Sequence, residues 1–205
     1  MSWVTQQVLI SAIYTSENVA KAVSKSAVDR LILIGDKQGA STEVDQSIEE
    51  IRNRFTGIEI STIRESPYDM ERIASKVADA VDEFEDADIS MNLTPGRKTQ
   101  SFAQMFAAYS RPSKVDELFY QREEGGRTRV PSLSIDMNEN ELQALHGVAD
   151  GGSTTQDLHS ELDVSQPMVY SYVNSLRDSG YMEGDNQNLS ATDAGNLVSR
   201  LLRTD

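Results

Sequence analysis

The 205-residue sequence contains no cysteine, and none of its apolar runs approaches the length of a membrane-spanning helix. The first absence excludes a disulfide framework and any metal site or nucleophile built on Cys. The start of the chain also lacks the basic and apolar regions of a leader peptide, so we expect a cytoplasmic, soluble protein with no membrane partner. Its length predicts one large or two small domains.

Positive charge is scarce: 19 Lys and Arg residues face 33 Asp and Glu residues, for a formal net charge of -14. Such an acidic, lysine-poor composition resembles that of proteins from salt-accumulating (haloarchaeal) cells. At roughly 1 M salt the Debye length falls to about 3 Å, so the self-repulsion of an acidic surface is screened. The alternative is simply an acidic protein from a low-salt cytoplasm.

The first 130 residues alternate apolar runs of strand length with helical patterns. The expected strands are 8–13, 31–35, 58–63, 87–91 and 115–120, with 128–130 pairing back as a hairpin, and the expected helices are 16–26, 42–55, 69–84 and 99–109. Continuous apolar runs suit strands buried on both faces, whereas the alternating run 58–63 suits a strand near an edge. The order predicts an α/β fold with a Rossmann-like parallel sheet and a C-terminal hairpin. Ser16 is expected to cap the first helix, and Ser41 or Thr42 the second.

The turn at 92–100 follows the fourth expected strand and carries what a phosphate requires. Gly96 allows close backbone approach, Asn92 and Thr94 offer neutral hydrogen-bonding groups, and Arg97 and Lys98 supply positive charge. Ligands of open parallel sheets lie beyond the carboxyl ends of the strands, often against helix N-termini. The pattern predicts an anion site here; an ordinary turn with two solvated cations is the alternative.

The first 130 residues lack the motif of a dinucleotide-binding site, and they contain no histidine for acid-base chemistry. No Gly-x-Gly-x-x-Gly follows the first strand, which disfavours NAD-dependent redox chemistry. Both histidines, His146 and His159, lie later in the chain at helical spacing typical of structural residues. The sequence therefore assigns no catalytic residue, no metal site and no cofactor.

From residue 136 onward the pattern changes to three helices, a hairpin and a closing helix. Asn138 and Glu141 form a capping-box pattern, and Thr154 or Thr155 begins a short second helix. The third helix begins after Ser165 with an early proline, and Gly180 ends it. This order is the layout of a winged helix-turn-helix and resembles winged-helix transcription regulators of bacteria and archaea.

The third helix carries an inward stripe of Val169, Val173 and Leu176, which fixes the side that faces away. Met168 is expected in the core. Gln and Asn pair with adenine edges, and Ser contacts phosphate or base. The residues predicted to contact double-stranded DNA are Ser165, Gln166, Pro167, Tyr170, Ser171 and Asn174, with Asn186 and Gln187 at the wing tip. Between 136 and 205 there are twelve acidic and only three basic residues, and this negative charge repels the phosphates of DNA. The alternative is therefore that the winged helix docks to a protein.

A Rossmann-like domain followed by a winged helix, with Asn92, Thr94 and Lys98 in the pattern Asn-x-Thr-x-x-x-Lys, resembles the CRISPR-associated Rossmann-fold (CARF) regulators. The resemblance implies a sensor at 1–130, a linker at 131–136 and a winged helix-turn-helix at 137–205. It also implies a homodimer with a cyclic oligoadenylate across the dyad, contacted by the first and fourth βα turns. The implied ligand-binding residues are Ser11, Tyr14, Thr15, Ser16, Asn92, Thr94, Gly96, Arg97 and Lys98.

The sequence thus favours a homodimeric DNA-binding transcriptional regulator that senses a nucleotide second messenger, linked by the resemblance to CRISPR antiviral defence. One alternative is a ring nuclease that cleaves cyclic oligoadenylate, in which Lys98 or Arg97 stabilises charge without a dedicated base. The other is an adaptor whose winged helix binds a protein.

Overall fold

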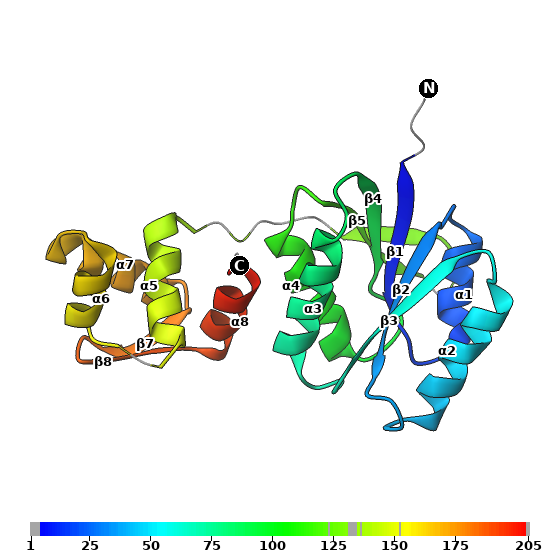
Figure 1. The fold of residues 1–205 in the computed structure, drawn as a ribbon, viewed down its shortest axis with the longest axis horizontal. Coiled ribbons are helices and arrows are strands. Elements are labelled where there is room, and N and C mark those ends of the chain that lie inside the picture. The colour runs from blue at the N-terminus through cyan, green and yellow to red at the C-terminus, as the bar shows by residue number, and fades with distance from the viewer. Residues whose placement is uncertain (1–4, 123, 131–134, 136, 152, 204–205) are drawn as a thin grey trace. The chain divides into compact units, whose positions relative to one another are not determined.

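Figure 1 shows the computed structural model of the chain, which describes residues 5–122, 124–130, 135, 137–151 and 153–203. The chain separates into two compact units, Met1–Ser134 and Ile135–Asp205. Among the described residues, no helix is both long enough and apolar enough to cross a membrane.

The first unit alternates strands and helices as the sequence predicts. Its elements are β1 (Gln6–Ala12), α1 (Ser16–Ser24), β2 (Arg30–Asp36), α2 (Thr42–Arg54), β3 (Glu59–Glu65), α3 (Met70–Asp82), β4 (Ala87–Asn92), α4 (Lys98–Ser110), β5 (Val115–Gln121) and β6 (Arg127–Val130). Within the described part of the chain they form one sheet in the order β3-β2-β1-β4-β5-β6. β1 to β5 pair in parallel, and β6 is antiparallel to β5. The α/β fold with a Rossmann-like parallel sheet is confirmed, with β3 at an edge.

Helices cover both faces of this sheet, α1 with α2 on one side and α3 with α4 on the other (Figure 1). Leu31 and Leu33 of β2 belong to one core cluster with Ile48 of α2. The alternate residues of the same strand, Ile32 and Ile34, are buried as well. Burial on both faces is the reason that these strands are continuous apolar runs in the sequence.

Of the N-cap serines predicted for the first two helices, the structure confirms the one at α2 but not the one at α1. At α2 the Ser41 hydroxyl accepts a hydrogen bond from the Val44 backbone N–H at 3.3 Å, as predicted. At α1 the prediction is wrong, because Thr15 occupies the N-cap position and Ser16 is the first helical residue. The Ser16 hydroxyl donates instead to the Glu50 carboxylate on α2, a partner 34 residues away that local spacing could not reveal.

The second unit is helical with a small hairpin. Its elements are α5 (Glu139–Ala149), α6 (Thr155–Leu162), α7 (Gln166–Asp178), β7 (Met182–Asp185), β8 (Asn188–Ala191) and α8 (Asp193–Leu201). β7 and β8 pair antiparallel. Its core joins residues from all three of the first helices to the hairpin, including Leu145, Leu158, Val169, Val173 and Leu189.

α7 has one buried and one exposed side. The predicted inward stripe of Val169, Val173 and Leu176 is buried. The prediction for Met168 is wrong, because its side chain is 45% exposed. Consecutive helical residues lie about 100° apart, and this step from Val169 carries Met168 out of the buried stripe.

Candidate functional site

The first unit has a switch point between β1 and β4. The chain leaves β1 towards β2 and returns through β4, so the connections that follow β1 and β4 run to opposite faces of the sheet. Ser11 near the end of β1 lies opposite Asn92 at the end of β4. The loop after β1 and the turn after β4 therefore emerge side by side, at the place where open α/β sheets bind ligands.

Gly96 brings the turn after β4 close to β1. Its φ is +87°, and a Cβ built there would lie 2.5 Å from the Ala12 Cβ and 2.6 Å from the Gln100 Oε1. Gln100 accepts a hydrogen bond from the Arg97 backbone N–H at 2.8 Å. The Ser101 hydroxyl donates to the Leu93 carbonyl at 2.8 Å. Only glycine fits this position, and the turn is held by the first residues of α4.

Three of the residues expected to bind a ligand lie within the framework of this turn. Ser11 and Asn92 are fully buried. The Asn92 Oδ1 accepts from the Thr94 N–H at 3.2 Å, while its buried Nδ2 has no hydrogen-bond partner among the described residues. The Thr94 hydroxyl accepts from the Gln121 N–H of β5 at 2.5 Å. The Asn92 and Thr94 hydrogen bonds hold the turn from inside, whereas the Ser11 hydroxyl donates to the Ala12 carbonyl within the β1 end.

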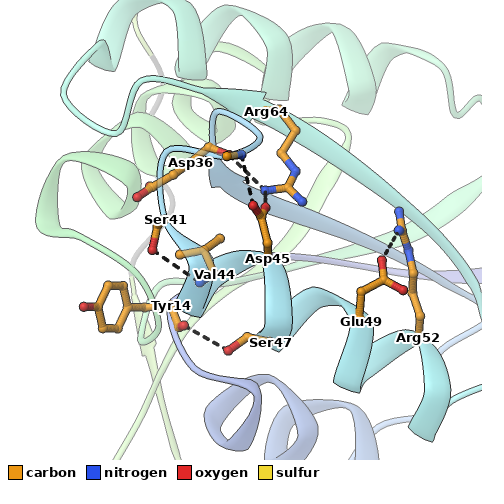
Figure 2. Close-up of polar contacts among 10 residues, drawn as sticks. Tyr14, Asp36, Ser41, Val44, Asp45, Ser47, Glu49, Arg52 and Arg64 are labelled. Atoms are coloured by element: carbon orange, nitrogen blue, oxygen red, sulfur yellow. Dashed lines mark hydrogen bonds and ion pairs between the residues drawn. The ribbon is translucent and has the colours of Figure 1, made fainter.

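Tyr14 and Thr15 lie at the surface after β1. Tyr14 is 39% exposed, and its carbonyl accepts from the Ser47 hydroxyl of α2 at 3.1 Å (Figure 2). Its hydroxyl donates a hydrogen bond to the Glu43 carboxylate, which raises the pKa of Tyr14. Thr15, at the N-cap of α1, is exposed.

Arg97 is the most connected of the predicted residues. Its Nη2 lies 3.6 Å from the Asp36 Oδ2, and its guanidinium carbon lies 5.7 Å from the Tyr14 ring centroid and 5.4 Å from that of Tyr68. Lys98 is exposed and has no ion pair among the described residues. The turn thus presents one cation held between two aromatic rings and a second that faces solvent.

Asp36 and Tyr68 are site residues that the sequence did not single out. Asp36 ends a buried strand at the carboxyl edge of the sheet, which was a usable signal. Tyr68 lies in the loop between β3 and α3, in no periodic pattern. Only the tertiary structure places it beside Arg97.

Acidic groups at the ends of β2 and β3 are paired with cations. Glu65 is buried, and its carboxylate accepts from the Lys76 Nζ at 2.7 Å, which lowers the pKa of Glu65. In Figure 2, Arg64 donates to the Asp36 carbonyl at 3.0 Å and to the Asp45 carboxylate at 2.7 Å. The Gly39 N–H and the Arg64 guanidinium lower the pKa of Asp45. Over the described residues no group of three or more metal-ligating side chains occurs.

A cavity of about 470 Å³ lies beside the turn, between α1 and the ends of β4 and β5. Lys21, Lys25 and Arg122 line it together with Thr94. Glu124 also lines it, and the Lys21 Nζ lies 2.8 Å from the Glu17 Oε1, so the cavity carries charges of both signs.

In the second unit, most residues expected to meet DNA share one solvent-facing side of α7. Tyr170 is half-buried; the others are exposed: Ser165, Gln166, Pro167, Ser171 and Asn174. At the hairpin tip Asn186 and Gln187 are exposed too. The Asn186 Oδ1 accepts from the Arg177 guanidinium of α7 at 3.2 Å, which ties the hairpin to that helix.

The sheet order and the turn define the first unit as a Rossmann-like α/β domain in which β1 and β4 end side by side at the switch point of the sheet. A sequence comparison gives the family: the model described as HFX_2341_N:-like, N-terminal, matches residues 9–124, and the chain belongs to that family. Among curated proteins, no match was found.

Two solved structures align with the chain at low identity, and the first of them, with a TM-score above 0.5, has the same fold. Enterococcus italicus Csm6 bound to cyclic hexa-2′-fluoro-hexa-dAMP aligns with a TM-score of 0.52 and 12% identity, over 86% of this chain and 55% of that one. Can2 from Sulfobacillus thermosulfidooxidans, in complex with cyclic tetra-adenylate, aligns with a TM-score of 0.48 and 12% identity, over 95% and 64%. The chain therefore spans less than two thirds of the length of either structure.

Proposed function

We propose that the protein is a homodimeric transcription regulator in which a CARF domain senses a nucleotide second messenger and a winged helix-turn-helix binds DNA. The domains are a sensor at 1–130, a linker at 131–136 and a DNA-binding domain at 137–205. Most of the linker lies outside the described residues. The observation that carries the proposal is the Gly96 turn, which presents Arg97 and Lys98 at the start of α4 beside the end of β1.

The effector that this turn fits is an anionic nucleotide. α4 is a 13-residue helix whose N-terminal end attracts negative charge, and two cations stand at that end on an otherwise acidic protein. Csm6, which shares the fold, was solved with a cyclic adenylate analogue. Cyclic oligoadenylate is accordingly the effector we propose, with the βα-turn residues as its contacts and CRISPR antiviral defence as the setting.

A homodimer would place two such turns around one ring-shaped ligand. α4 carries apolar side chains at helical spacing on its outer side: Phe102, Met105, Phe106 and Tyr109. Phe102 is 50% exposed and the other three are half-buried. A partly exposed apolar stripe of this kind is typical of an interaction surface, and we assign it to a second copy of the chain.

The DNA-binding role is supported by the shape and chemistry of the second unit. α7 keeps its Gln, Ser and Asn side chains in solvent, a short hairpin follows it, and Arg177 connects the two. Amides and hydroxyls read base edges without net positive charge. At molar salt the electrostatic attraction to DNA phosphates contributes little to affinity, so an acidic DNA-binding domain is not at a disadvantage there.

The test is selection of genomic DNA fragments by the full chain at molar salt, followed by titration of an enriched fragment with and without cyclic tetra- or hexa-adenylate. We expect enrichment of fragments with two half-sites and an effector-dependent change in affinity of about fivefold or more. The double variant Arg97→Ala/Lys98→Ala should bind DNA but not respond. No enrichment would reject the regulator and favour the protein-binding adaptor, whereas enrichment without a shift would reject the sensing role.

The second candidate function is ring cleavage, because the structure brings a carboxylate to the turn. In this reaction Asp36, whose Oδ2 lies 3.6 Å from the Arg97 Nη2, would accept the proton of a ribose 2′-hydroxyl as its oxygen bonds to the adjacent phosphorus. The P–O5′ bond breaks, which leaves a 2′,3′-cyclic phosphate and a 5′-oxygen that takes up a proton from solvent, while Arg97 and Lys98 stabilise the charge on the phosphate. Linear products formed by excess protein and lost in Lys98→Ala would support this reaction. An intact ring after prolonged incubation would reject it.

A further inference from the structure

Tyr68 is a large aromatic side chain left in solvent beside the cationic turn. It is 72% exposed, in the loop between β3 and α3. The Arg97 guanidinium carbon lies 5.4 Å from its ring centroid. With most of the ring still accessible, a planar group can stack on it next to the cation.

The loop that carries Tyr68 is fixed in place. The Thr99 hydroxyl of α4 donates to the Pro67 carbonyl, which ties the loop to the helix that follows the glycine turn. The Asp69 N–H donates to the Ser66 carbonyl at 3.0 Å, and the Asp69 carboxylate accepts from the Arg72 N–H at 3.2 Å. A ligand that used the Tyr68 ring would therefore meet a preorganised surface, at little cost in ordering.

The surroundings of the ring match one class of ligand. Tyr14 approaches the same guanidinium at 5.7 Å, so two partly exposed aromatic rings accompany one cation. Aromatic rings stack with nucleobases of any sequence, while guanidinium and ammonium groups bind phosphate. Lys98, in the first turn of α4, adds the second cation. Ring and cations side by side fit a nucleotide better than they fit a bare anion.

We propose that Tyr68 forms a nucleobase subsite: a purine base of the effector stacks on its ring while the attached phosphate binds at Arg97 and Lys98. The proposal rests on the proposed nucleotide sensing and deepens it, because it makes the β3–α3 loop a third contributor beside the turns after β1 and β4. Tyr68 then provides preference for a nucleotide over a sugar phosphate or inorganic phosphate.

Calorimetric titration of the full chain tests this with adenosine 5′-monophosphate, ribose 5-phosphate and cyclic tetra-adenylate. Base stacking of about 1–3 kcal/mol corresponds to a preference of about 5- to 150-fold for adenosine 5′-monophosphate over ribose 5-phosphate. In Tyr68→Ala the affinities for adenosine 5′-monophosphate and ribose 5-phosphate should become equal, whereas Tyr68→Phe should retain the wild-type preference. Met168→Ala, which removes an exposed apolar side chain (45%) in the second unit, should leave the preference unchanged.

Two results would overturn the subsite: equal affinities in the wild type, or an unchanged preference in Tyr68→Ala. In the second case, loss of all binding in Arg97→Ala/Lys98→Ala would leave the proposed sensing intact. If the wild type binds neither cyclic tetra-adenylate nor either monophosphate, the sensing proposal fails together with the subsite. Thermal unfolding of Tyr68→Ala should match the wild type, since so exposed a ring contributes little packing.

Discussion

At the scale of single residues, the candidate site depends on a glycine whose place no other residue can take. Gly96 combines a positive φ with a Cβ position only 2.5 Å from Ala12. Replacement by alanine must therefore strain the backbone and push the turn away from β1. The conformation of the cationic turn and the packing of β1 against it are linked through this one position.

We predict that Gly96→Ala lowers the free energy of unfolding by about 2–3 kcal/mol, measured by urea denaturation. The matched control is Gly57→Ala, where a Cβ meets nothing within 4 Å and φ is not positive. That control should stay within about 0.5 kcal/mol of the wild type. Equal stabilities of the two variants would show that the turn tolerates a side chain.

A second prediction at this scale concerns Glu65, whose pKa lies below the ordinary value of a glutamate carboxyl because Lys76 donates a hydrogen bond to it. A carboxyl with a lowered folded-state pKa stabilises the protein above its unfolded pKa and loses that contribution as pH falls through the folded value. Glu65→Gln should thus cost about 2 kcal/mol near pH 7. The difference from the wild type should shrink below pH 4.5 in urea titrations at each pH.

The control for Glu65 is Glu49→Gln, which removes an exposed carboxylate paired with Arg52 at 2.7 Å. It should change stability by less than about 0.5 kcal/mol at any pH. A Glu65→Gln deficit that persisted undiminished at pH 3 would assign the effect to side-chain packing instead of charge.

For single residues, the sequence could predict the chemistry of the turn but not which distant residues contact its side chains. Arg97 and Lys98 follow a strand and precede a helix, a local pattern that is visible in one dimension. Asp36 and Tyr68 reach Arg97 only after β2 and the β3–α3 loop are brought to the same edge of the sheet. Their contribution is non-local, so no spacing rule could have found it.

At the scale of elements, the sequence predicted periodicity well and the details of helix ends and faces less well. α7 has the predicted buried stripe because valine and leucine recur every three to four residues. Met168 is exposed in spite of its apolar side chain, because its angular position on the helix, and not its hydrophobicity, determines what it contacts. Its position puts an apolar group within the polar surface proposed to meet DNA.

We predict that Gln166→Ala weakens binding to a selected DNA fragment by about 1–3 kcal/mol, or about 5- to 150-fold, without changing stability. Gln166 is exposed at the first turn of α7, where a recognition helix contacts base edges. Gln143→Ala, which removes an exposed glutamine from α5, serves as the control and should bind as the wild type does. A gel-shift titration at constant salt measures both, and equal binding would remove α7 as the reading helix.

At the scale of the whole molecule, the proposed function requires two copies of the chain. The outer stripe of α4 is the surface that we assign to this contact, with Phe102 as its most exposed member. A charge placed there would face its own copy across the proposed dyad and would have to be desolvated at an apolar contact.

We predict that Phe102→Asp converts a dimer to a monomer in light-scattering chromatography at molar salt, while its circular dichroism stays that of the wild type. The control Ser113→Asp adds the same charge at an exposed position outside α4 and should remain dimeric. A wild-type chain that is monomeric with and without cyclic oligoadenylate would contradict the dimer. If Phe102→Asp remained dimeric, the α4 stripe would be rejected as the interface, and the dimer would have to form through another surface.

By itself the sequence determined the order of strands and helices, the parallel sheet, and the location of a cationic glycine turn after β4. These follow from local periodicity and from residues next to one another in the chain. The tertiary structure alone decided that Asp36, Tyr14 and Tyr68 surround Arg97, that Ser16 bonds across to α2, and that Asn92 and Ser11 are buried. The reason is physical: side chains tens of residues apart become neighbours only when the strands that carry them are laid into one sheet.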